Sequence, residues 1–180
     1  MKRLLAGLAF VGLSMPLMLQ AAHVPEIKRV KSATPNAPIL AGVVVPGGTS
    51  LFYLSGQVPA AIDASKPTDS IDAYGDTKAQ AVSVFKKIEA LLTEQGLTLQ
   101  DVVKLTVYLV GDPKKGNKLD FKGFSEAYGQ FFGTATQPNL VARTTVQVAA
   151  LANPGFLVEI EATAAAADKP TKGGVKSPPK

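Results

Sequence analysis

The 180-residue sequence contains no cysteine and only one histidine. Without cysteine, the chain has no disulfides, thiolate nucleophiles, iron–sulfur clusters, cysteine-ligated zinc or lipid attached at a signal-peptide cysteine. A protein zinc site usually needs three or four side-chain ligands, so His23 alone does not anchor one. A Ser-His-Asp triad would also need this histidine, which lies near the N-terminus in a segment expected to be unfolded. We therefore interpret His23 as a solvated terminal residue.

Acidic residues are fewer than basic ones, with 14 Asp and Glu against 19 Lys and Arg, which gives a formal net charge of +5. Such an excess can indicate binding to nucleic acid or to a membrane surface. Here it lies at the two ends, because Lys2 and Arg3 contribute two positive charges and residues 168–180 contribute three. Residues 22–167 contain 13 basic and 13 acidic side chains, so the folded region is formally neutral. We therefore expect no nucleic-acid partner.

The N-terminus has the order of a secretory signal peptide. Two basic residues precede a mostly apolar run, Leu4–Leu19, and small residues follow at Ala21 and Ala22. The run is short for a transmembrane helix and contains a proline. We predict that residues 1–21 are removed and that the mature protein is periplasmic or secreted, with no membrane contact after cleavage. The cleavage site is looser than the usual pattern, which leaves an uncleaved anchor as the alternative.

Beyond the signal peptide, the length and the 46% hydrophobic content fit one globular domain. Residues 22–37 mix charge and proline and are expected to form an extended lead-in. Residues 38–167 contain the domain. Residues 168–180 hold three prolines, two glycines and four lysines, and we expect them to form a disordered basic tail.

Hydrophobic spacing predicts two helices and five strands. A capping box at Thr77–Gln80 opens the first helix, whose apolar residues recur at helical spacing until Gly96. Asp120 is expected to cap the second helix, whose row of aromatic side chains is interpreted as core and which ends at Gly133. The strands are expected at Ile39–Val45, Leu51–Leu54, Val103–Leu109, Arg143–Val148 and Phe156–Ala162. The first two are expected to form one hairpin and the last two another.

This order, β-β-α-β-α-β-β, predicts an α+β domain in which two helices cover one face of a mainly antiparallel sheet. Alternation in the last two strands then places Arg143, Glu159 and Glu161 on the uncovered face. Spacing alone leaves two interpretations open. In the first, this is a solvated face with cross-strand ion pairs. In the second, another subunit covers it, so that the arginine can bind a substrate carboxylate while a glutamate exchanges a proton with water.

Four segments resemble motifs of the Rid family, also known as RidA/YjgF or endoribonuclease L-PSP. Leu54–Pro59 is similar to the SGQ-x-P segment of that family, and residues 124–132 are similar to a helical segment that ends in two phenylalanines. Ala142–Val148 and Val158–Ala162 resemble the family's AR strand and its VEIEA strand. The resemblance covers about residues 38–166, in order and with compatible spacing.

The resemblance implies a chorismate-mutase-like fold assembled as a homotrimer, with the sheets inside, the helices outside and a site in each cleft between subunits. Active family members hydrolyse 2-imino acids and enamines to 2-oxo acids and ammonia, and they need no metal or organic cofactor. The resemblance also implies that Arg143 binds the substrate carboxylate and that Glu159 positions the attacking water. The further substrate-binding positions that it implies are Ser55, Gly56, the backbone carbonyl of Thr145, and Ser125.

One departure from the family pattern bears on activity. Ile39 stands where active members carry a tyrosine, so a phenol hydrogen bond is absent. We therefore hold two hypotheses: an exported imine deaminase, and a catalytically silent protein of the same fold that binds small carboxylates. RNA cleavage, which the alternative family label suggests, is disfavoured because the folded region has neither a histidine for acid–base work nor a basic stripe with interleaved aromatics.

Overall fold

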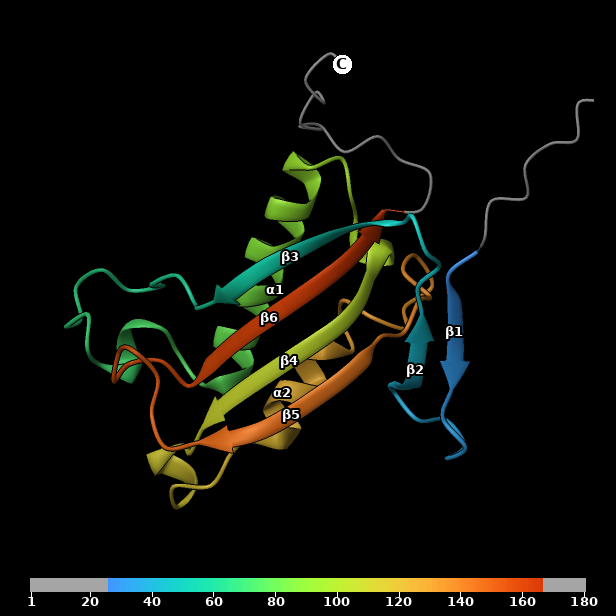
Figure 1. Ribbon diagram of the computed structural model, residues 1–180. Helices are drawn as coiled ribbons and strands as arrows, with labels where there is room; N and C mark the ends of the chain where they lie inside the picture. Colours follow the sequence, from blue (N-terminus) through green and yellow to red (C-terminus); the bar gives the residue numbers. More distant parts are fainter. Residues whose placement is uncertain (1–25, 167–180) are drawn as a thin grey trace, which may run out of the picture.

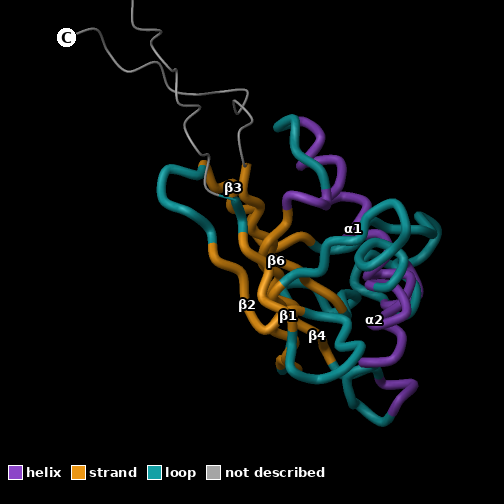
Figure 2. The backbone as a smooth tube through the Cα atoms, turned by 90° about the vertical axis from the view of Figure 1, so that its right-hand side faces the viewer, coloured by secondary structure: helices purple, strands orange, loops and turns teal. Residues whose placement is uncertain are grey.

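The computed structural model describes residues 26–166, which form a six-stranded sheet with both α-helices on one side (Figure 1). Figure 2 shows the two layers edge-on, with the helices on one face of the sheet. The helices are α1 (Thr77–Glu94) and α2 (Phe121–Tyr128), and the strands are β1 (Lys28–Lys31), β2 (Leu40–Val44), β3 (Ser50–Gln57), β4 (Val102–Val110), β5 (Ala142–Val148) and β6 (Val158–Ala166). The α+β architecture with helices on one face is confirmed. The predicted signal peptide and C-terminal tail lie outside the described residues.

The strand order is β1-β2-β5-β4-β6-β3, and the sheet is mixed. Strands β1 and β2, β4 and β6, and β3 and β6 are antiparallel neighbours, whereas β2 and β5, and β4 and β5, are parallel neighbours. Both predicted hairpins are therefore wrong: β2 and β3 lie far apart in the strand order, and β4 lies between β5 and β6. The physical reason is that α2 connects β4 to β5, and a helical crossover allows a parallel pair.

The core lies between the sheet and the helices. Alternate residues of β4 are buried on the helix side, as the alternation predicted, and they are Val103, Leu105, Val107 and Leu109. Phe85 of α1 is fully buried against the rings of Phe124, Tyr128 and Phe132. The rings of Phe124, Tyr128 and Phe132 follow the helical spacing of α2 and of the turn after it, so their interpretation as core residues is confirmed. Phe121, in the same predicted row, is 50% exposed. The helix ends at Tyr128 rather than at the predicted Gly133.

The first helix begins one residue earlier than the capping box indicates. Asp76, rather than Thr77, caps α1, because its carboxylate accepts the N–H of Ala79 at 2.9 Å. Gln80, the predicted closing residue of the box, is buried, and its amide hydrogen-bonds the backbone on both sides of the turn that leads into β6. A side chain recruited into the core is no longer available to cap its own helix.

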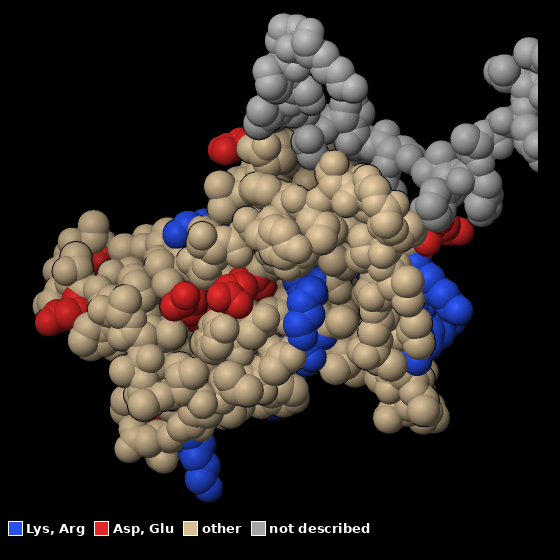
Figure 3. Space-filling model, in the orientation of Figure 1, with Lys and Arg blue, Asp and Glu red and all other residues tan. Residues whose placement is uncertain are grey.

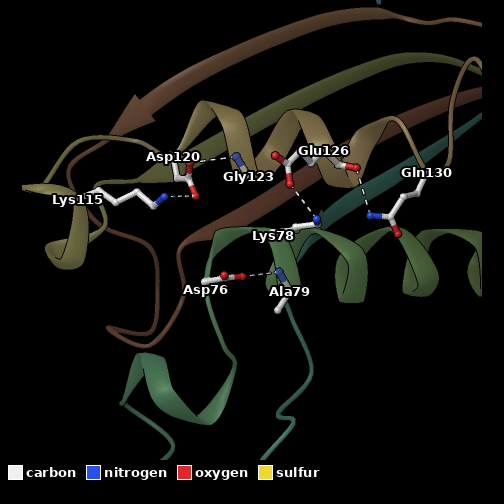
Figure 4. A network of polar contacts seen from close by, with 8 residues as sticks. All are labelled: Asp76, Lys78, Ala79, Lys115, Asp120, Gly123, Glu126 and Gln130. Carbon is white, nitrogen blue, oxygen red and sulfur yellow. Dashed lines mark hydrogen bonds and ion pairs between the residues drawn. The ribbon is translucent and has the colours of Figure 1, made fainter.

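Asp120 caps α2 as predicted. Its carboxylate accepts the N–H of Gly123 at 3.0 Å and pairs with the Lys115 ammonium at 3.1 Å (Figure 4). Burial would raise the pKa of Asp120, but the Gly123 hydrogen bond and the charges of Lys115 and Lys122 outweigh burial and lower it. A carboxyl group with a lowered pKa stabilises the folded state above its unfolded pKa, and this contribution is lost as the pH falls through its folded pKa.

We therefore expect Asp120→Asn to lower the free energy of unfolding by about 1 kcal/mol at pH 7, because asparagine keeps the cap but loses the ion pair. The difference from wild type should shrink below about pH 4, where the wild-type carboxylate becomes protonated. Urea unfolding of both proteins at a series of pH values measures the difference in their free energy of unfolding. A difference that stays constant from pH 7 to pH 2 would contradict the assignment.

The predicted extended lead-in contains a strand, β1, that the sequence pattern did not predict. β1 pairs with β2, and β2 reaches the rest of the sheet through a single parallel pair, Leu40 with Ala142. Arg29 of β1 connects the two strands to the rest of the domain through three hydrogen bonds. Its guanidinium donates to the carbonyls of Gln100 at 2.7 Å, Leu140 at 2.7 Å and Val102 at 3.1 Å. Burial lowers the pKa of Arg29, and the charge of Asp101 opposes the shift.

Candidate functional site

Arg143 lies on the helix-covered face of the sheet. It is in register with the fully buried Leu105 of β4. Its guanidinium carbon lies 4.4 Å from the ring centroid of Tyr128, 5.1 Å from that of Phe124 and 5.9 Å from that of Phe121. All three rings belong to α2, and this set is called the aromatic cradle below. The prediction that Arg143 shares the uncovered face with the glutamates is therefore wrong.

The error has a physical cause. The sequence pattern assigned Thr144, Val146 and Val148 to the apolar face, but Val146 is exposed and Thr144 accepts a hydrogen bond from Lys104. The alternate positions, although polar, face α2. A guanidinium is weakly hydrated and stacks on aromatic faces, so the cradle accommodates a side chain that a binary pattern assigns to solvent.

Arg143 has no carboxylate partner among the described residues. It forms none of the ion pairs found there, and its Nη1 is buried with no hydrogen-bond partner. Burial lowers the pKa of Arg143, and the nearby Tyr128 opposes the shift. A buried polar group without a partner is unusual in folded proteins, and a buried cation more so. The aromatic cradle therefore holds a cation that is suited to an anionic ligand.

Glu159 lies on the other face of the sheet, opposite Tyr108 in the β4–β6 register. Its side chain lies directly over Gly56, where a Cβ atom would overlap the carboxylate. The register between β3 and β6 shifts between Leu54 and Gln57, which places Gly56 in an irregular part of the strand. The structure thus brings Gly56 and Glu159 together, as residues at one site would be.

Tyr108 is a residue that the sequence analysis did not select. Its hydroxyl donates to Glu161 at 3.2 Å. Partial burial raises the pKa of Tyr108, and the charges of Glu161 and Glu159 add to the shift. Figure 3 looks onto this face and shows acidic side chains near its middle with basic atoms beside them. Alternation in β4 places Tyr108 on the mixed face of that strand, but only the β4–β6 pairing shows that it lies beside the VEIEA segment.

The remaining predicted residues divide between the two faces. Thr145 is in register with Val107, so it lies on the helix-covered face with Arg143, and its Oγ1 is also buried without a hydrogen-bond partner. Ser55 is exposed in β3, beside Gly56. Ser125 is half-buried on α2, between two residues of the cradle. Within one chain, the set therefore forms an arginine side and a glutamate side, separated by the sheet.

Ile39 is partly buried against the core. The carbonyl of Pro38, the residue before it, accepts the hydroxyl of Tyr128 at 3.0 Å. A cavity of about 560 Å³ extends from Ile39 along the β1–β2 loop to residues 138–140. The residue before Ile39 thus contacts one ring of the aromatic cradle, and Ile39 presents an aliphatic side chain at the position where the family resemblance implies a tyrosine.

Within residues 26–166, no group of three or more His, Asp or Glu side chains is placed to hold a metal ion. In the same part of the chain, neither helix has the length and apolar character needed to cross a bilayer.

Comparison with known proteins supports this description. The family model described as endoribonuclease L-PSP matches residues 35–166. A RutC family protein of Pyrococcus horikoshii is 37% identical over 134 residues, which are 73% of this chain and 93% of that protein. Protein DfrA of Myxococcus xanthus is 37% identical over 114 residues, which are 63% of this chain and 75% of that protein.

Solved structures of related proteins are also similar to this chain. A Rid-family protein of unknown function, YyfB from Yersinia pestis, is 25% identical, with a TM-score of 0.58 over 78% of this chain and 98% of that one. E. coli TdcF, solved with bound serine, is 29% identical, with a TM-score of 0.51 over 78% and 97%. The E. coli yjgF gene product is 30% identical, with a TM-score of 0.50 over 67% and 84%. Since the family match covers most of the chain and includes the Arg143, Glu159 and Gly56 positions, the chain belongs to the endoribonuclease L-PSP family, also called the Rid, YjgF or RutC family.

Proposed function

We propose that this protein hydrolyses short 2-imino acids to 2-oxo acids and ammonia. The observation that carries the proposal is the Arg143 guanidinium, held over three rings of α2 with Nη1 buried and unpaired. A substrate carboxylate supplies the missing anion and can accept two parallel hydrogen bonds from the planar fork. The serine bound to the related TdcF is itself a small amino acid with a carboxylate.

The reaction needs one water molecule and a group that moves its proton. Water adds to C2 of the imine while Glu159 accepts a proton from it, and the imine nitrogen takes up a proton. The resulting carbinolamine then collapses to the 2-oxo acid and releases ammonia. Glu159 suits this role because its carboxylate lies against Gly56, where no side chain separates it from an approaching substrate.

Arg143 and Glu159 can act on one substrate only if a second copy of the chain contributes to the site, because the sheet separates the two residues within one chain. We propose a homotrimer in which Glu159 of a neighbouring subunit faces the aromatic cradle. The uncovered sheet face supports this, since Tyr53 is 71% exposed there and Leu51 and Val146 are each 40% exposed. A groove of about 250 Å³ between Tyr53, Lys104 and Glu161 leaves room for an inserted side chain.

The test generates 2-iminopropanoate from alanine with an amino-acid oxidase and traps the surviving imine with semicarbazide. Wild-type protein should shorten the lifetime of the imine in proportion to its concentration. If imine decay is unchanged by the protein, the deaminase proposal is wrong.

The second candidate is a carboxylate-binding protein without catalysis, and Ile39 is the observation that favours it. Its aliphatic side chain packs against the core where active family members carry a phenol. This candidate predicts that 2-oxobutanoate binds, as measured by calorimetry, while imine decay is unchanged. Accelerated decay would exclude it.

Export is a separate proposal that rests on the order of residues 1–21. We propose that the leader is removed after Ala21 and that the protein acts outside the cytoplasm. N-terminal sequencing of protein recovered from the periplasm or the medium should begin at Ala22. Recovery of intact protein from the cytoplasm alone would contradict it.

A further inference from the structure

A row of three polar side chains runs along the helix-covered face of β5. Arg143, Thr145 and Gln147 are in register with three fully buried residues of β4, Leu105, Val107 and Leu109. Three successive polar residues on a face that is otherwise apolar are unusual, because burial of each polar group is unfavourable unless it forms hydrogen bonds. Gln147 is exposed, whereas Arg143 Nη1 and Thr145 Oγ1 are buried, so the latter two groups need a partner.

Only one of the three has its partners within the described residues. The Gln147 amide accepts the N–H of Leu119 at 3.0 Å and donates to the carbonyl of Asn117 at 3.1 Å, so the loop before α2 satisfies it. Arg143 Nη1 and Thr145 Oγ1 are buried, and neither has a hydrogen-bond partner in that part of the chain. The two unsatisfied groups are neighbours on the same face, so one ligand can satisfy both.

We propose that the Thr145 hydroxyl determines substrate specificity by binding a hydroxyl group on the substrate's terminal carbon. This inference rests on the proposed function, in which Arg143 holds the carboxylate. The substrate class is then short 2-imino and 2-oxo acids with a hydroxylated side chain. This role of the Thr145 side chain is independent of the role that the family resemblance implies for its backbone carbonyl.

The geometry favours a short acid. Residues two apart on one face of a strand lie about 6.6 Å from each other along the strand. This spacing separates the two backbone positions, and in the proposed arrangement a three-carbon acid places its carboxylate at the guanidinium and its terminal hydroxyl at Thr145. A threonine hydroxyl both donates and accepts, so it can pair with a ligand hydroxyl in either direction. A methyl group on the ligand, in place of its terminal hydroxyl, would leave the buried Oγ1 of Thr145 unpaired.

The experiment compares two nearly isosteric acids by calorimetry, 3-hydroxy-2-oxopropanoate and 2-oxobutanoate, which differ in a hydroxyl against a methyl group. Wild-type protein should bind the hydroxylated acid about tenfold more tightly. Thr145→Val should remove this preference, so that it binds the two acids with equal affinity, whereas Thr145→Ser should retain the preference. Without ligand, Thr145→Val should melt no lower than wild type, because it replaces an unpaired hydroxyl with a methyl group.

The outcomes separate this inference from the proposed function. Equal binding of the two acids by wild-type protein, abolished in both cases by Arg143→Ala, overturns the role of Thr145 and leaves the carboxylate site intact. A preference that persists in Thr145→Val also overturns it. If wild type binds neither acid, the carboxylate site fails, and the inference fails with it.

Discussion

Arg143→Ala is expected to reduce 2-imino acid hydrolysis at least about thirtyfold, because removing one partner of a buried charge pair costs about 2–5 kcal/mol. Affinity for 2-oxobutanoate should fall to a similar extent, since the same guanidinium binds its carboxylate. Arg143→Lys keeps the charge but not the planar fork or the stacking on α2, so it should recover only part of the loss. Steady-state imine decay and calorimetry measure the two effects.

The matched control is Arg29→Ala, which removes the other half-buried arginine. Arg29 already donates to three backbone carbonyls, so its loss should lower the free energy of unfolding by about 2 kcal/mol and reduce ligand affinity far less than Arg143→Ala does. If both arginine variants lose stability and neither loses affinity, then Arg143 is a structural residue and the carboxylate site is wrong.

The same variant tests whether subunits share the site. Arg143→Ala and Glu159→Gln should each be inactive alone. Co-refolded mixtures should regain part of the activity, because some clefts then combine an intact arginine from one subunit with an intact glutamate from another. Mixtures as inactive as the parent variants would show that the two residues do not act across a subunit boundary.

Gly56→Ala is expected to lower the rate of hydrolysis about a hundredfold with little change in 2-oxobutanoate affinity. The added methyl group would overlap the Glu159 carboxylate, which must move away. Misplacing a catalytic group by about 1 Å is enough for a loss of this size. The fold should survive, since the overlap is with the end of a flexible side chain and Gly56 has no positive φ.

Gly47→Ala is the control for this prediction, because a Cβ atom there meets nothing within 4 Å and its φ is not positive either. It should retain wild-type kinetics. Comparing kcat with the binding constant then separates a displaced Glu159 from a general loss of structure. A Gly56→Ala variant with a wild-type rate would show that the position of Glu159 does not limit the reaction.

Sequence patterns predicted the helices and strands better than they predicted which strands pair. The alternation in β4 and the Asp120 cap depend on residues close together in the chain, and both are confirmed. Strand pairing depends on long-range competition: β2 pairs with a strand from the predicted lead-in, and β3 pairs with β6. Alternation shows which residues share a face but not which strand lies alongside.

The candidate site shows the same limit. The motif resemblance selected Gly56 and Glu159, and the register of β3 with β6 was needed to show that they are in contact. The face of Arg143 was assigned incorrectly because polarity alone does not reveal an aromatic surface on the opposing helix. Phe121, Phe124 and Tyr128 recur three and four residues apart, which is the spacing that predicts a continuous stripe on α2.

The attachment of β1 and β2 also has a dynamic consequence. The two strands are connected to the sheet by one parallel residue pair, the Arg29 contacts, and the bond from Tyr128 to the Pro38 carbonyl. A segment that is held by so few contacts can open locally while the rest of the fold stays intact. Amide hydrogens of β1 and β2 should thus exchange before those of β4. Each opening frees the hydroxyl of the tyrosine that lies over Arg143, so the fluctuations of the N-terminal strands are coupled to the cation at the candidate site.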